Sequence, residues 1–453
     1  MTWLSLRSFD RKTMGNSLRQ TLCSCTMHKE ETSYQHWKDD SRTGSGIPLA
    51  DLRRLSLTTR SSDQTTEELS VSSFLISNVI GIGGFGLVRV AIRAGSHHDK
   101  ALLAIKSISK ESVVRRSTNG LKAVLNELDA MCILKGCPFI SEMKYAFQDA
   151  IFLYLVTSCY LGGDLRYNMK ATKLCRFPEA TAKFYIVQVL LALKHCHSHF
   201  ILHRDIKPEN LFMDSHGYIR VGDFGISKIL SPSLIDECDS TSGTKGYLPP
   251  EVYAPTHLHG RTADIFSMGV CFHEFLTGRR PYEVGQLQAF RDPNHVTTNF
   301  DLDFLDNCAH VSSGAKIFLH QALHWDRFNR LGSNEGVLDA LQHLYLQNMD
   351  IVSIANKQIQ APHIPNGNFV HCDVKTADAQ EAIRNHCMAS PVVQQHFFDN
   401  FKIDNHVSSE RNEKRTSLSP LTIATKFHPT NEFNRLRTRV ESSSSCIVSN
   451  YSK

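Results

Sequence analysis

The chain has 453 residues, of which 41% are hydrophobic, enough for one large or two modest cores. Its 50 Lys and Arg only slightly exceed its 45 Asp and Glu, and the formal net charge of +5 gives no reason to expect a nucleic-acid partner. No apolar run approaches the roughly 20 residues of a membrane helix, and 13 Cys without a Cys-x-x-Cys pair favour reduced thiols in a cytoplasmic protein, with nuclear or peripheral-membrane location as alternatives.

Residues 1–70 are rich in Ser, Thr and Arg and lack sustained periodicity, which predicts a disordered N-terminal extension. Within it, Met14-Gly15-Asn16-Ser17 is similar to the start of a myristoylation signal, and Cys23 and Cys25 are candidates for palmitoylation. Lipid anchoring requires translation to start at Met14, and obligatory targeting is not expected.

From residue 71 the pattern becomes that of a packed domain. Apolar or alternating runs predict strands over 74–80, 87–92, 102–108 and 152–157, and helical spacing marks 122–134 and 179–197. Strands first and helices later predict an α+β, bilobal fold, with a small β-rich lobe over about 71–157 and a larger, mostly helical lobe over about 161–346. Residues 347–453 turn polar again and are expected to form a largely irregular tail.

A glycine-rich segment lies between the first two predicted strands. Glycine lets the backbone approach phosphates closely. A dinucleotide fold requires a helix directly after such glycines, whereas here the chain continues as a strand, so a lid over a nucleotide is favoured. The candidate nucleotide-binding residues of this segment are Gly81, Gly83, Gly84, Phe85, Gly86 and Val88.

Charged residues follow in apolar surroundings. Lys106 interrupts an apolar strand and needs a partner if buried, for which Glu127 on the next helix is suited. Residues 203–210, His-Arg-Asp-Ile-Lys-Pro-Glu-Asn, stand between apolar pairs, which indicates a loop held on a rigid frame. Asp223 opens an Asp-Phe-Gly sequence, and with Asn210 it supplies the hard oxygen ligands that Mg²⁺ prefers.

The order of these segments resembles the signature set of the eukaryotic protein kinases over about residues 74–346. The resemblance implies a serine/threonine kinase that uses ATP and Mg²⁺ to phosphorylate proteins. It assigns Lys106, paired with Glu127, to the α- and β-phosphates. It makes Asp205 the base and Lys207 the cation beside the moving phosphoryl group, and it gives the two metal ions to Asn210 and Asp223.

Further positions follow from the same resemblance. Ala104, Thr157 as gatekeeper, and Tyr160 in the hinge would line the adenine pocket. Asp264 would brace the backbone of the catalytic loop, and Glu251 would pair with Arg330.

Several segments resemble the AGC group of kinases. These are Leu161-Gly162-Gly163-Asp164-Leu165 and Ala361-Pro362-His363-Ile364-Pro365, and Phe398-Asp399-Asn400-Phe401 resembles the motif with which tails of this group dock on the small lobe. Residues 162–167, 145–149 and 243–245 and the pair Cys372-Asp373 are more narrowly similar to YANK-type kinases. The ordinary Asp-Phe-Gly sequence departs from that subfamily, so a cyclic-nucleotide-dependent or related AGC enzyme is the alternative.

The resemblance also suggests regulation and substrate choice. Ser240 is the candidate activation-segment phosphosite, with Arg204 and Lys228 as the expected clamp for its phosphate and an upstream activating kinase as a candidate partner. Asp164, Glu209 and Glu274 match groove positions that attract basic residues ahead of the acceptor. Ser56, after Arg53-Arg54-Leu55, is a candidate autophosphorylation site.

Two other classes of function are considered. A scaffold could use the same fold only to bind partners, but intact Lys106, Asp205 and Asp223 argue against it. An enzyme acting on small molecules is disfavoured by the complete activation segment.

Overall fold

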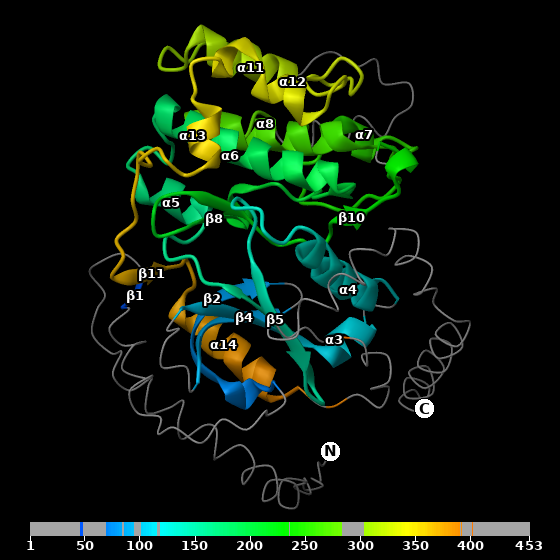
Figure 1. The fold of residues 1–453 in the computed structure, drawn as a ribbon, viewed down its shortest axis with the longest axis vertical. Coiled ribbons are helices and arrows are strands. Elements are labelled where there is room, and N and C mark those ends of the chain that lie inside the picture. The colour runs from blue at the N-terminus through cyan, green and yellow to red at the C-terminus, as the bar shows by residue number, and fades with distance from the viewer. Residues whose placement is uncertain are drawn as a thin grey trace, which may run out of the picture.

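The computed structural model describes residues 46–48, 69–83, 86–94, 101–115, 118–234, 236–282, 303–389, 391 and 401. The expectations for Met14, Ser56, Gly84, Phe85 and Phe398 fall outside these residues. A sheet-containing lobe and a helical lobe are stacked along the long axis of the molecule (Figure 1). The predicted bilobal α+β architecture is confirmed.

The small lobe is built on one antiparallel sheet of five strands in the order β2-β3-β4-β6-β5. Because successive side chains of a strand alternate between its faces, Ile105 is fully buried while its neighbour Lys106 is directed to the opposite face. The elements of this lobe are η1 (Val71–Ser73), β2 (Phe74–Gly83), β3 (Gly86–Arg93), β4 (Leu103–Ser109), α3 (Lys110–Arg115), α4 (Thr118–Ile133), β5 (Met143–Gln148) and β6 (Phe152–Ser158).

The large lobe is mostly helical, and its catalytic loop lies between two short strand pairs, β7–β10 and β8–β9. Its helices are α5 (Leu165–Ala171), α6 (Glu179–Ser198), η2 (Pro208–Asn210), η3 (Pro232–Leu234), α7 (Pro250–Tyr253), α8 (Arg261–Thr277), α10 (Asp303–Asp306), α11 (Ser313–Ala322), α12 (Val337–Leu341), η5 (Leu344–Leu346) and α13 (Ile351–Ala355). Its strands are β7 (Ile201–Leu202), β8 (Leu211–Met213), β9 (Ile219–Val221) and β10 (Lys228–Ile229).

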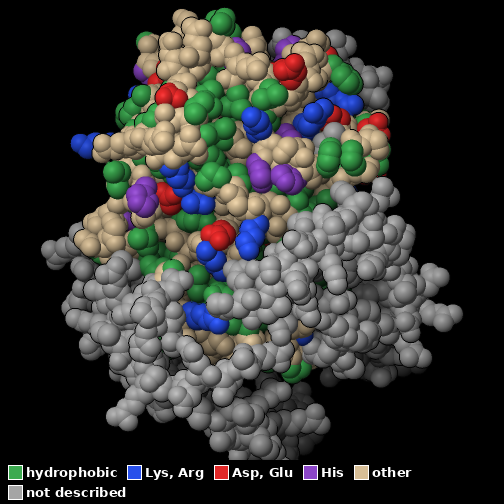
Figure 2. Space-filling model, viewed as in Figure 1, with side chains coloured by type: hydrophobic (Ala, Val, Ile, Leu, Met, Phe, Trp, Pro, Cys, Tyr) green, Lys and Arg blue, Asp and Glu red, His purple; other side chains and the backbone are tan. Residues whose placement is uncertain are grey.

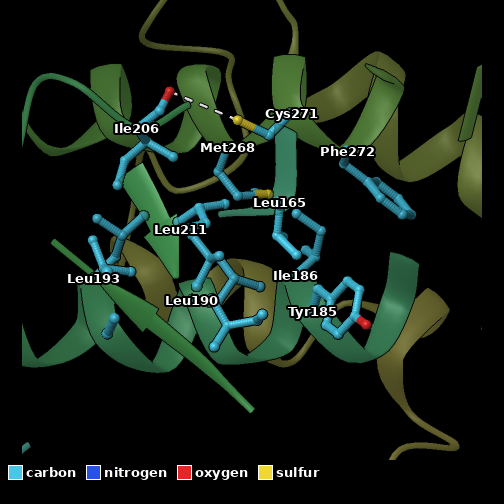
Figure 3. Packing of buried hydrophobic residues seen from close by; sticks show 14 of the residues in the cluster. Leu165, Tyr185, Ile186, Leu190, Leu193, Ile206, Leu211, Met268, Cys271 and Phe272 are labelled. Atoms are coloured by element: carbon cyan, nitrogen blue, oxygen red, sulfur yellow. Dashed lines mark hydrogen bonds between the residues drawn. The ribbon is translucent and has the colours of Figure 1, made fainter. Parts of the chain in front are cut away.

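The buried core of the large lobe packs against the catalytic loop and fixes its backbone. Leu190 of α6, Ile206 of the loop and Met268 of α8 are fully buried and point toward one another (Figure 3). The Cys271 thiol donates a 3.7 Å hydrogen bond to the carbonyl oxygen of Ile206, shown as the dashed line in Figure 3. Apolar anchors therefore hold a loop whose polar side chains lie between them, as the sequence predicts.

The described part of the tail returns to the small lobe and carries more regular structure than its polar composition predicts. β11 (Phe369–His371) pairs antiparallel with β1 (Gly46–Pro48), and α14 (Thr376–Cys387) lies against the small sheet (Figure 1). Ala379 of α14 is buried against Val79 and Leu87. The helix was not expected from the sequence, because its apolar stripe is short. Such a helix is stabilised mainly by packing against a partner surface, which here is the small sheet.

The described part of the chain contains no helix long and apolar enough to cross a membrane. On the face seen in Figure 2, Lys and Arg side chains lie among Asp, Glu and His side chains rather than forming one stripe.

Candidate active site

Lys106 of β4 is the centre of an ion-pair network between the lobes. Its Nζ lies 2.8 Å from both carboxylate oxygens of Glu127 on α4 and 3.6 Å from Oδ1 of Asp223. The Glu127 side chain is only 6% exposed. The strand, the helix and the Asp-Phe-Gly segment thus bring together Lys106, Glu127 and Asp223, the three charged residues that the sequence indicated as site residues.

Lys106 and Asp223 are shifted toward their charged forms in this network, whereas burial raises the pKa of Glu127 above its ordinary value. Burial disfavours the ammonium of Lys106, but the carboxylates of Glu127 and Asp223 outweigh it and raise the pKa of Lys106 above its ordinary value. Burial likewise opposes ionisation of Asp223, but Lys106, His203 and Lys207 lower its pKa below the ordinary value. Asp223 is therefore an anion at neutral pH, as a ligand for a cation must be.

Asp205 lies at the centre of a second network. Its Oδ2 accepts hydrogen bonds from Lys207 Nζ at 2.7 Å and from Asn210 Nδ2 at 3.0 Å. Its Oδ1 accepts from the backbone N–H and the hydroxyl of Thr244, at 3.0 Å and 2.6 Å. This carboxylate is thus oriented from both sides, and a hydroxyl group already donates to it.

The backbone of the catalytic loop is fixed by the buried carboxylate of Asp264. Its oxygens accept from the N–H groups of His203 at 3.0 Å and Arg204 at 2.7 Å, and it also contacts His197 at 2.8 Å. The expected bracing role of Asp264 is confirmed. Arg204 and Asp223 have φ values of +67° and +59°, a left-handed conformation that is costly for residues with a Cβ. The surrounding contacts maintain this strain at the site.

The positions expected around adenine come together in the small sheet. Ala104 of β4 pairs with Thr157 of β6, and Val88 of β3 pairs with Lys106. Gly81 and Gly83 face Val88 and Gly86 across the β2–β3 hairpin. Tyr160 follows β6, and its hydroxyl accepts a hydrogen bond from the Glu142 N–H at 3.0 Å.

The activation segment contacts the catalytic loop through Arg204. The Arg204 guanidinium donates to the hydroxyl of Ser240 and, at 2.8 Å, to the carbonyl oxygen of Ile226. Within the described residues, Lys228 forms no hydrogen bond to Ser240, so only one half of the expected clamp is in contact. Beyond the segment, both nitrogens of the Arg330 fork pair with Glu251 at 2.7 Å and 2.8 Å, as expected.

The three acidic residues expected in the peptide groove differ in their surroundings. Asp164 caps α5 by accepting from the Tyr167 N–H at 2.8 Å, and burial raises its pKa to about 6. Glu209 and Glu274 both bind Arg166, which lies within the 162–167 motif and for which the sequence predicted no role. Arg166 was missed because its two carboxylate partners are 43 and 108 residues away in the sequence.

Comparison with known proteins bears directly on this geometry. The model of the protein kinase domain matches residues 74–346, which is more than half of the chain. The chain belongs to the protein kinase family. The kinase is 30% identical to a probable serine/threonine-protein kinase of Dictyostelium discoideum over 345 residues, which cover 74% of this chain and 71% of that protein.

Two human relatives place the kinase more narrowly. It is 30% identical to serine/threonine-protein kinase 32B over 70% of this chain and 73% of the relative. It is also 30% identical to ribosomal protein S6 kinase alpha-4 over 67% of this chain and 40% of the relative. These similarities support the AGC and YANK-type resemblance, and the kinase is an ATP-dependent serine/threonine protein kinase acting on protein substrates.

Proposed function

We propose that the two networks form the phosphoryl-transfer site, with each residue in the role that its position in the signature set implies. The observation that carries the proposal is the contact of Lys106 with both Glu127, at 2.8 Å, and Asp223, at 3.6 Å. That contact joins the sheet lobe to the Asp-Phe-Gly segment across the place where nucleotide phosphates bind in this family.

Asp205 is the proposed base. It accepts the proton of the acceptor hydroxyl as that oxygen bonds to the γ-phosphorus and the bond from phosphorus to the β–γ bridging oxygen breaks, releasing ADP. The Thr244 hydroxyl donates a hydrogen bond to Asp205 Oδ1 at 2.6 Å. This contact supports the role, because a hydroxyl group already occupies the position from which Asp205 would accept a proton. Lys207, 2.7 Å from the other oxygen, supplies positive charge beside the transferred group.

Asn210 and Asp223 fit a magnesium site of the kind that nucleotide phosphates complete. The Asn210 amide nitrogen is used by Asp205, which leaves its oxygen available as a hard ligand, and Asp223 is ionised. Magnesium is commonly held by one or two protein oxygens together with substrate phosphates. When bound, it neutralises the charge of the phosphates during transfer.

The expected preference for basic residues before the acceptor is also part of the proposal. Asp164, Glu209 and Glu274 supply more negative charge than Arg166 neutralises, which supports a modest attraction of basic peptides. Ser240 is the proposed regulatory phosphosite, because the cation that would receive its phosphate, Arg204, already touches its hydroxyl.

Two substitutions test the roles of Lys106 in transfer and of Asp223 in metal binding. Lys106→Met is expected to abolish detectable transfer, and Asp223→Asn to remove the Mg²⁺ dependence of nucleotide affinity measured by displacement of a fluorescent nucleotide. Lys144→Met is the matched control, since Lys144 is also an ion-paired lysine of the same sheet, 2.8 Å from Glu142. Retention of Mg²⁺-dependent affinity by Asp223→Asn would contradict the assignment of the metal ligands.

A further inference from the structure

Arg166, on the first turn of α5, is held by the same carboxylates that are proposed to receive basic substrate residues. Its Nη1 and Nη2 lie 2.6 Å and 3.0 Å from the two oxygens of Glu274, a bidentate arrangement. Its Nε donates to Glu209 at 2.8 Å. One guanidinium therefore bridges two carboxylates that belong to α8 and to the catalytic loop.

The guanidinium of Arg166 is almost fully used within the chain. Its Nη2 also donates to the Tyr247 hydroxyl at 2.6 Å, and that hydroxyl in turn donates to Glu274 at 2.6 Å. Four of its five N–H donors are thus engaged. This is the set of contacts that an arginine side chain arriving from a peptide would be expected to make.

The two carboxylates are not equally exposed. The Glu274 side chain is 7% exposed, whereas that of Glu209 is 43% exposed. Burial opposes the charge of Arg166, but Glu274 and the other acidic groups around it outweigh that effect and raise its pKa above the ordinary value. An ion pair with one buried partner and bidentate geometry is much harder to separate than a surface pair.

We propose that Arg166 is a specificity-determining residue that occupies the acidic subsite from within the chain and weakens selection for arginine in the substrate. This inference rests on the proposed function, in which Glu209 and Glu274 face the peptide. An incoming arginine competes with an intramolecular guanidinium that needs no association step. Only the half-exposed Glu209 remains accessible to it, which leaves the modest basic preference described above.

A second arginine, Arg280, lies against the segment that precedes Tyr247. Arg280 Nη1 donates to the Lys245 carbonyl oxygen at 3.4 Å and lies against Gly246, where a Cβ would come within 1.9 Å of that nitrogen. Gly246, with φ of +93°, thus makes room for a positive side chain beside Tyr247.

The test uses matched pairs of peptides with a single serine. The two peptides of a pair differ at one of the five positions before the serine, which is arginine in one peptide and alanine in the other. The full chain and its Arg166→Met variant, which keeps the aliphatic stem, are assayed for kcat/KM on each pair. Arg166→Met is expected to raise the arginine-to-alanine ratio about 10-fold at one or two positions. Lys170→Met is the control, because Lys170 lies one turn further along α5 and pairs with Asp373 instead.

A second variant keeps the inference testable if Arg166→Met folds poorly. Glu209→Gln removes a half-exposed charge, and it is expected to change the arginine-to-alanine ratio of the parent chain by less than about 3-fold, since Arg166 leaves that carboxylate only a modest attraction for basic residues. A fall of about 10-fold in the parent chain would overturn the inference. An unchanged ratio in well-folded Arg166→Met would overturn it as well. Phosphorylation of both peptides at equal rates by every variant would overturn the inference together with the basic preference, and it would leave the kinase assignment standing.

Discussion

Replacing Glu127 by Gln tests how much the buried ion pair contributes to catalysis. The carboxylate makes two contacts of 2.8 Å with Lys106 and is only 6% exposed, so little solvent screens the pair. The amide keeps one acceptor oxygen and loses one charge-assisted bond, which costs about 2–3 kcal/mol. At 1.36 kcal/mol for each factor of ten, kcat/KM should fall about 30- to 160-fold. The Lys106 ammonium would then interact more strongly with the carboxylate of Asp223, which lies 3.6 Å away.

The assay is steady-state transfer to a serine peptide, with nucleotide affinity and thermal unfolding measured on the same samples. Glu111→Gln is the control, because Glu111 pairs with Arg115 at 2.6 Å on the neighbouring helix α3 in an exposed i,i+4 pair. Such pairs contribute at most about 1 kcal/mol, so activity should be unchanged. Undiminished kcat/KM in a folded Glu127→Gln variant would refute the assigned role of the pair.

Three further outcomes are expected. Burial against Phe152 lowers the pKa of His386 to about 4 in the folded chain. The unfolded chain therefore binds a proton at a higher pH than the folded chain does. The parent should lose more thermal stability than His386→Phe as pH falls from 6.5 toward 4. Arg330→Met leaves Glu251 as an unpaired charge and should reduce the free energy of unfolding by about 3–5 kcal/mol in a denaturant titration. Asp264→Asn keeps one acceptor oxygen but places an amide donor against one of the two backbone donors, and it should reduce kcat about 100-fold with nucleotide affinity unchanged.

Most of the site could be predicted because each of its parts has a local signature. A lysine in an apolar strand, a charged loop between apolar pairs, and an aspartate before Phe-Gly are visible without any knowledge of tertiary contacts. The family resemblance then supplied the partners, and the contacts of Lys106 with Glu127, of Asp264 with the loop, and of Arg330 with Glu251 are present in the structure. The strands expected over 74–80, 87–92, 102–108 and 152–157 all occur.

What could not be predicted depends on neighbours that are distant in the sequence. Arg166 has the same local pattern whether it points to solvent or bridges two carboxylates, and only the approach of α8 and the catalytic loop to α5 decides between them. The pairing of β1 with β11 joins segments more than 300 residues apart. Neither three-residue strand has a pattern strong enough to be recognised alone.

The central claim is tested most directly by transfer of labelled γ-phosphoryl from ATP to three peptides that differ only in having Ser, Thr or Tyr as acceptor. The full chain should label the Ser and Thr peptides and leave the Tyr peptide unlabelled. Asp205→Asn should reduce transfer about 10²- to 10⁴-fold while still binding nucleotide. Undiminished labelling by Asp205→Asn, or no labelling of any peptide by the full chain, would contradict the account.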